Sequence, residues 1–121
     1  MINRLYGVSR LPEVRTGPVR VSGYAIKVRR VINAALKDYY KEKKLDPKEI
    51  NQFLSDLNAK IYNVIVERFE IPKDAIVNVI IDYDVEEGGF VVKDLKIEVF
   101  DLDEILTRNV TTEVKKSLGI Q

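Results

Sequence analysis

Residues 77–100 read VNVIIDYDVEEGGFVVKDLKIEVF, and this run sets the architecture of the whole chain. Apolar and polar side chains alternate on both sides of the segment 86–89, Glu-Glu-Gly-Gly, with the period of two that a half-buried strand requires. Glycine tolerates the positive φ of a tight turn. The run therefore predicts a β-hairpin with one apolar face against helices and one acidic face toward solvent.

The apolar face of this hairpin is formed by alternate residues of both strands, namely Val77, Val79, Ile81, Tyr83, Val85, Val91, Leu95, Ile97 and Val99. Four of these side chains are expected to be buried: Val79, Ile81, Leu95 and Ile97. Three side chains of the opposite face are expected to be exposed: Asp82, Lys96 and Glu98.

Three amphipathic helices are predicted around the hairpin. The first covers residues 24–44, where an apolar stripe recurs with the helical period at Tyr24, Val28, Val31, Ile32, Ala35 and Tyr39. The second begins after Asp46, a capping residue with Pro47 at the first helical position, and ends before Pro72. The third is capped by Asp101 or Asp103, and its apolar face is Leu102, Ile105, Leu106, Val110, Val114 and Leu118.

A short strand is predicted at residues 18–22, ahead of the first helix, so the order of elements is β-α-α-β-β-α. We predict an α+β fold in which a small, mostly antiparallel sheet of three or four strands packs on helices. The chain is expected to form a single domain over residues 1–121, with residues 1–16 as an N-terminal arm or an extra strand. The apolar third helix and the exposed strand edges favour a homodimer or another homo-oligomer.

Composition excludes several classes of site. The 121 residues include no Cys and no His, which excludes disulfides, thiolate and imidazole metal sites and any nucleophile–histidine dyad. We therefore predict no enzymatic activity, no catalytic residues, no cofactor and no metal. The sequence contains no apolar run near twenty residues and no secretory leader, which predicts a cytoplasmic protein without a membrane partner. The scarcity of Met and the abundance of Lys, Arg and Glu also suit life at high temperature.

The net charge of +1 conceals a strong polarity along the chain. Residues 1–44 carry eleven basic and three acidic residues, for a charge of +8, whereas the remainder carries −7. On the predicted first helix, basic side chains fall within an arc of about 100° opposite the apolar stripe. We call this surface the basic face and define it, with the preceding strand, as Arg20, Lys27, Arg30, Lys37, Lys41 and Lys44.

Such a face can follow a phosphate backbone, and Tyr40 at its margin can stack on a base. The leading hypothesis is a non-enzymatic module that binds nucleic acid, either DNA or RNA. A purely solvated helix face explains the same pattern, because Lys and Arg are good helix formers. A third interpretation is a protein-interaction or assembly module, in which the basic face meets an acidic partner such as the acidic sheet of another copy.

The carboxylates Asp82 and Asp84 leave the same face of a strand, and Asp94 and Glu98 are possible neighbours. Hard cations such as Mg²⁺ accept such ligands. The segment lacks a Gly-rich phosphate loop and a further ligand at a helix end, and Lys96 offers a cross-strand counter-ion. We interpret the cluster as a solvated sheet face.

The segment Ser22-Gly23-Tyr24-Ala25-Ile26-Lys27-Val28-Arg29-Arg30, followed much later by Ile81-Asp82-Tyr83-Asp84-Val85, resembles a family of small archaeal proteins. The resemblance covers most of residues 17–100 and implies an archaeal, thermophilic source without a known activity.

A looser similarity links the chain to the archaeal chromatin protein Alba. It involves the Ser22-Gly23 entry into the first helix and the segment from residues 66–69 through Pro72 into the hairpin. Alba-like proteins bind DNA or RNA as dimers through a basic loop and a protruding hairpin, so the similarity implies nucleic-acid binding. This chain departs from that pattern, because it has no strand between its first two helices, an acidic hairpin tip and an added C-terminal helix. No functional residue is transferred from Alba.

Overall fold

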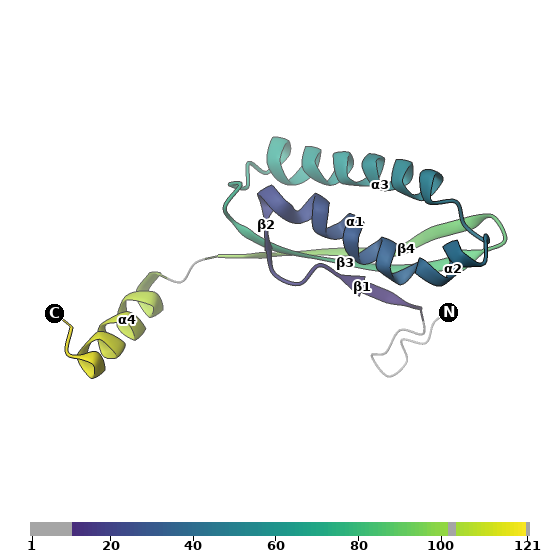
Figure 1. Cartoon of the computed structure of the whole chain (residues 1–121). Coiled ribbons are helices and arrows are strands. Elements are labelled where there is room, and N and C mark those ends of the chain that lie inside the picture. The colour runs from purple at the N-terminus through teal and green to yellow at the C-terminus, as the bar shows by residue number, and fades with distance from the viewer. Residues whose placement is uncertain (1–10, 102–103, 121) are drawn as a thin grey trace.

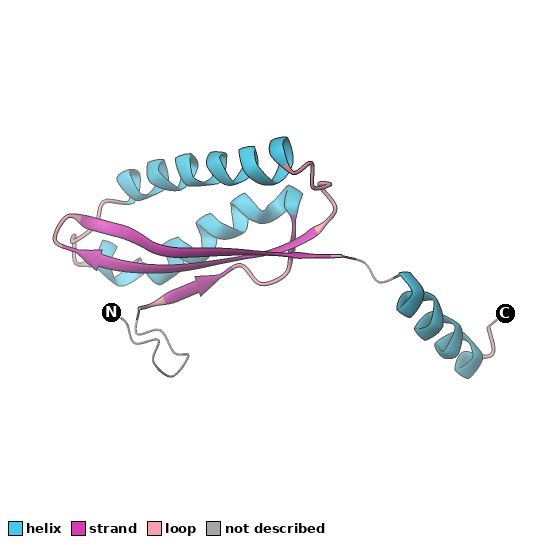
Figure 2. Ribbon diagram, turned by 180° about the vertical axis from the view of Figure 1, so that it is seen from behind, coloured by secondary structure: helices cyan, strands magenta, loops and turns pink. Residues whose placement is uncertain are grey.

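A four-stranded antiparallel sheet with helices on one face forms the body of the protein (Figure 1). The computed structural model describes residues 11–101 and 104–120. Helices α1 (Tyr24–Ala35), α2 (Lys37–Lys41) and α3 (Pro47–Tyr62) cover the sheet, and α4 (Glu104–Leu118) lies apart from it (Figure 2). The α+β fold class is confirmed. No helix in the described part of the chain is long and apolar enough to cross a membrane.

The central strand of the sheet is β3 (Ile76–Glu86). On one side it pairs with β4 (Gly89–Phe100), and on the other side with the two short strands β1 (Glu13–Arg15) and β2 (Val19–Arg20). Strand β1 lies within residues 1–16, the segment predicted to be an N-terminal arm or an extra strand, and residues 1–10 lie outside the described residues.

Strands β1 and β2 are separated by a turn that remains attached to β3. Gly17 takes a φ of 73°, a left-handed conformation that glycine adopts without the steric cost of a Cβ. The backbone N–H of Thr16 donates to Val79 O at 3.0 Å, and the Thr16 hydroxyl oxygen accepts from Val79 N at 3.0 Å. These two bonds keep the β1–β2 segment in register with the central strand.

The hairpin contains a β-bulge that the alternating pattern did not predict. Asp82 is opposite Asp94, but Tyr83 is opposite Val92, so Lys93 is the additional residue of β4. The extra residue interrupts the alternation of side chains in β4. Residues on the hairpin-tip side of the bulge therefore point to the opposite face from the one that simple alternation predicts. As a result Val92 and Phe90 pack against the core, and the assignment of Val91 to the core face was wrong.

The first predicted helix is interrupted. Leu36 separates α1 from α2 with φ −94° and ψ 6°, and α2 ends at Lys41, before the predicted end at residue 44. Hydrogen bonds from Leu36 N to Ile32 O and from Tyr40 N to Leu36 O continue the helical turn across the interruption. Tyr24, Val28 and Ile32 of the predicted apolar stripe are buried, but Ala35 is exposed. Its place in the core is taken by Leu36, which the predicted stripe did not include.

The predicted start of the second helix is confirmed, because Asp46 Oδ1 accepts from Lys48 N at 3.0 Å and Pro47 follows in the first turn. A π-helical segment, Asn63–Arg68, extends α3 toward Pro72. At the other end of the chain, Gly119 follows α4 with a φ of 73°. It donates to Lys116 O, and Ile120 donates to Lys115 O, which closes the helix with the bonds of a Schellman motif.

The expectations about the burial of Leu95, Asp82 and Glu98 were wrong, and Glu98 is half-buried rather than exposed. Val79 and Ile81 are buried and Ile97 is half-buried, but Leu95 is 39% exposed. Helix α1 packs over β1, β2 and β3, so β4 lies at the margin of the helical layer and Leu95 is left uncovered. Conversely, Asp82 is only 6% exposed, because it lies on the central strand between β1 and β4 and their side chains flank it.

Candidate nucleic-acid interface

The basic face covers the end of β2, helices α1 and α2 and the turn that follows them. Arg20, Arg30, Lys37, Lys41 and Lys44 are exposed, and Lys27 is half-buried. Of the basic-face residues, Lys44 alone forms an ion pair with a carboxylate of the described residues, its Nζ lying 3.1 Å from Glu42 Oε1. The interruption at Leu36 divides the face between two helices. It therefore presents several solvent-facing cations whose charge is largely uncompensated locally.

Arg29, which borders the basic face, has a structural role. Its guanidinium donates to Asn51 O at 3.2 Å, to Asn51 Oδ1 at 3.0 Å and to Ser55 Oγ at 3.0 Å. These bonds join α1 to α3. Asn33 Nδ2 adds a second link by donating to Asn51 Oδ1 at 2.9 Å. The polar network fixes the helix that carries the basic face relative to its neighbour.

Tyr40, at the margin of the basic face, belongs to the same network. The side chain is half-buried against the core, and its hydroxyl donates to Asn33 Oδ1 at 2.5 Å. Burial raises the pKa of Tyr40 above its usual value. One side of Tyr40 nevertheless reaches a cavity that sequence reasoning missed.

This cavity, which we call the tip pocket, has a volume of about 600 Å³ and lies between the α2–α3 connection and the tip of the β3–β4 hairpin. Its walls include Leu45, Ile50, Phe53 and Phe90. The rings of Phe53 and Phe90 meet edge to face, with centroids 5.7 Å apart and planes at 73°. Phe90 also contacts Tyr83, with centroids 5.4 Å apart.

The rim of the tip pocket carries charges of both signs: Lys43, Lys44, Asp46, Glu49 and Glu87. The sequence feature that marks this pocket is an aromatic residue, Phe90, directly after Gly88-Gly89 at the hairpin turn. That signal could not reveal a pocket, because the opposing wall comes from the start of α3, far away in the sequence.

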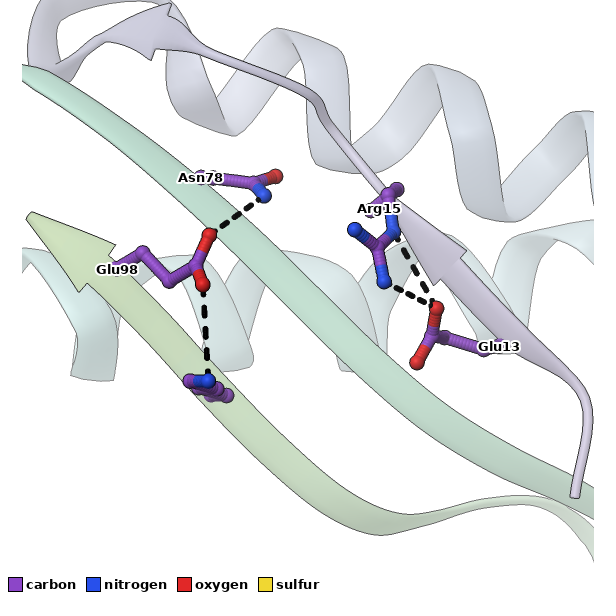
Figure 3. Close-up of polar contacts among 5 residues, drawn as sticks. Glu13, Arg15, Asn78 and Glu98 are labelled. Atoms are coloured by element: carbon purple, nitrogen blue, oxygen red, sulfur yellow. Dashed lines mark hydrogen bonds and ion pairs between the residues drawn. The ribbon is translucent and has the colours of Figure 1, made fainter. Parts of the chain in front are cut away.

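The outer face of the sheet is a network of paired charges rather than a bare acidic surface (Figure 3). Arg15 donates to Glu13 Oε1 at 3.2 and 2.6 Å, and Asn78 Nδ2 donates to Glu98 Oε1 at 3.0 Å. Lys96 Nζ lies 3.6 Å from Glu98 Oε2, so it pairs along its own strand. The Asn78 amide holds the pKa of Glu98 below its usual value, and Lys96 contributes to the same shift.

In the described part of the chain, no group of three or more acidic side chains is arranged to hold a metal ion. The row Glu13, Asp82 and Asp94 crosses three neighbouring strands. Like charges in such a row repel, and Arg15 lies beside Asp82 and Glu98 as an attractive counter-charge.

Comparison with solved structures identifies two similar proteins. The crystal structure of apeThermo-DBP-RP2 bound to ssDNA dT10 is 28% identical in sequence to this chain and superposes on it with a TM-score of 0.75. The match covers 90% of this chain and 51% of that one. The crystal structure of pfuThermo-DBP-RP1 is 29% identical in sequence and superposes with a TM-score of 0.64. This match covers 89% of this chain and 74% of that one. The chain thus spans about half the length of the first of these proteins. No curated protein matches the sequence significantly.

A protein-family model described as ThermoDBP-related, archaea, matches residues 14–91. The match confirms the resemblance to a small archaeal family, whereas these comparisons do not show a relationship to Alba. The matched segment begins in β1 and ends in β4, so it includes α1, α2 and the tip pocket. Because it covers more than half of the 121 residues, the chain belongs to the archaeal ThermoDBP-related family.

Proposed function

We propose that this protein is a non-enzymatic module that binds single-stranded nucleic acid, with the basic face as its contact surface. The observation that carries the proposal is the similar structure bound to single-stranded DNA, which matches 90% of this chain at 28% identity. A single strand in solution exposes phosphates and unpaired bases together. A basic surface near apolar and aromatic side chains suits such a ligand.

The placement of charge on α2 supports the basic face as the contact surface. Lys37 and Lys41 on α2 are exposed and form no ion pair with another described residue, so each can neutralise a phosphate without first breaking a protein contact. Lys44 adds a third cation beyond the end of α2. Release of counterions from the bound strand provides the driving force, and it makes the affinity dependent on salt.

The test is a titration of the full chain with labelled single-stranded DNA, single-stranded RNA and duplex DNA at several salt concentrations. For about three to five neutralised phosphates, the log–log slope of affinity against salt should be roughly −2 to −3.5 for a single strand. Single strands should bind more tightly than duplex DNA. A protein that binds none of the three ligands at low salt would refute the proposal.

Single substitutions on α2 test whether the nucleic acid contacts the basic face. Lys37→Ala and Lys41→Ala should each make the single-strand slope shallower by about 0.7 and weaken binding equally for all sequences. Lys60→Ala is the matched control, because Lys60 is exposed on α3 and lies outside the basic face. Equal slopes for all three variants and the wild type would remove the basic face from the interface.

A second candidate function is assembly, and α4 is the observation that favours it. All described residues of this helix are exposed, including the apolar residues Val110, Val114 and Leu118. These residues recur every four positions and form a continuous stripe, which is the pattern that another helix can cover. We propose that the stripe pairs with α4 of a second copy, in addition to nucleic-acid binding rather than in place of it.

A further inference from the structure

We propose that the tip pocket binds one unpaired nucleobase of the single strand, an inference that rests on the proposed function. The pocket adjoins the basic face directly, because Lys44 belongs to both. A strand whose phosphates follow Lys37, Lys41 and Lys44 is therefore led to the mouth of the pocket. The pocket also offers what the basic face lacks, which is a surface for the flat face of a base.

The apolar wall of the pocket matches the chemistry of a base. Leu45 and Ile50 are buried beneath it, and Phe53 remains 39% exposed at its side. The edge-to-face contact with Phe90 fixes the Phe53 ring, so a ligand does not have to order a mobile side chain. Every base has a π-face that can stack on such a ring whatever its sequence.

The charges at the rim select the base over the phosphate. Two lysines, Lys43 and Lys44, face three carboxylates, Asp46, Glu49 and Glu87, so an anion gains little by entering. Asp46 already accepts from the backbone N–H of Lys48. Glu49 and Glu87 are exposed, and their oxygens can accept hydrogen bonds from base N–H groups. A neutral base therefore fits inside, and its flanking phosphates stay outside among the lysines.

The size and position of the pocket agree with this occupant. A volume of about 600 Å³ is within the range of small-molecule sites and exceeds the need of a single base. A base that is paired and stacked within a duplex cannot reach a site between a hairpin and a helix start. The pocket thus supplies a physical reason for a preference for single strands, which a row of lysines alone does not.

The first experiment compares two single-stranded DNA ligands of about ten nucleotides that have identical phosphates. One carries bases throughout, and the other is abasic. Fluorescence anisotropy at fixed salt should show that the wild-type protein binds the base-containing strand about 5-fold to 150-fold more tightly. Equal affinity for the two strands would overturn the base-binding inference while leaving phosphate binding by the basic face intact.

The second experiment assigns that difference to the pocket. Phe53→Leu keeps an apolar side chain in α3 but removes the stacking ring. Phe69→Leu is the control, because Phe69 is 69% exposed and lies beyond the opposite end of α3. Only Phe53→Leu should weaken binding of the base-containing strand, again by about 5-fold to 150-fold, and neither variant should alter binding of the abasic strand.

A third variant blocks the pocket without changing Phe53, so that a loss of binding in Phe53→Leu can be distinguished from a loss of folding. Gly88 lines the pocket at the hairpin tip, and a Cβ placed there meets no atom within 4 Å. Gly88→Leu should therefore fold normally and obstruct the pocket, with the same selective loss of the base-containing strand. Wild-type affinity in both Phe53→Leu and Gly88→Leu would refute the inference. Failure of the wild-type protein to bind any strand would instead refute the proposed function as well.

Discussion

Tyr24 is a buried side chain whose hydroxyl donates a hydrogen bond inside the core. The residue is 3% exposed, and its hydroxyl donates to Asn58 O at 2.7 Å, while Asn58 Nδ2 donates to Ala25 O at 3.2 Å. The pair joins the first turn of α1 to α3 inside the core. Burial raises the pKa of Tyr24 to about 12, and the neighbouring Tyr62 adds to the increase.

We predict that Tyr24→Phe lowers the free energy of unfolding by about 1 kcal/mol at neutral pH, because it removes one buried hydrogen bond between α1 and α3. The raised pKa means that the folded state retains its proton more strongly than the unfolded chain. The corresponding stability is fully present below pH 10 and is lost as the pH rises toward about 12.

Chemical denaturation at neutral pH and at several alkaline pH values tests both parts of this prediction. Wild-type protein should lose more stability than Tyr24→Phe over the alkaline range. Tyr40 and Tyr83 also have raised pKa values and remain in both proteins, so the difference between the two curves isolates Tyr24. Parallel curves would contradict the assigned pKa.

At the scale of elements, side chains on the same face of the two hairpin strands differ in how deeply they are buried. Ile81 of β3 is opposite Leu95 of β4, and both side chains point toward the helices. Ile81 is 1% exposed, whereas Leu95 is 39% exposed. The difference arises because β3 is central, with neighbours on both sides and α1 above it, while β4 forms the margin of the sheet.

We predict that Ile81→Ala destabilises the protein by roughly 2–5 kcal/mol, because it removes buried methylenes and leaves a cavity. Leu95→Ala should cost far less, since much of that side chain is already in water. Urea unfolding monitored by circular dichroism gives both values. Comparable losses at the two positions would mean that something covers β4 in solution.

At the scale of the whole molecule, the protein consists of a packed body and a projecting helix (Figure 2). The body buries its apolar stripes between α1, α3 and the sheet. Helix α4 has an apolar stripe of its own, but its described residues are exposed throughout. Because a continuous apolar stripe in water is unfavourable, we expect α4 to be covered by another copy.

We predict that Val110→Asp abolishes this self-association by placing a charge within the stripe. Thr112→Asp is the control, because it puts the same charge about 160° away from Val110 around the helix. Light scattering coupled to size exclusion should report a dimer or larger oligomer for the wild type and Thr112→Asp, and a monomer for Val110→Asp. A monomeric wild type at high concentration would contradict the proposal.

Local patterns were sufficient to predict most of the elements. Alternation of polarity around Gly88-Gly89 predicted the hairpin, the 3.6-residue period predicted α1, and Asp46-Pro47 predicted the start of α3. These features depend on backbone preferences and on neighbours within a few residues. The basic face could also be identified from spacing alone, although its role in binding stays a prediction.

The sequence by itself determined where most of the helices and strands lie and which face of β3 is apolar. Tertiary structure decided what covers those faces: Asp82 is buried on the central strand, Leu95 is exposed on the marginal one, and the bulge at Lys93 brings Val92 to the core. It also brought Phe53 and Phe90 together to form the tip pocket. The physical reason is that periodicity reports the direction of a side chain along its own element, whereas burial and cavities depend on packing between elements that lie far apart in the chain.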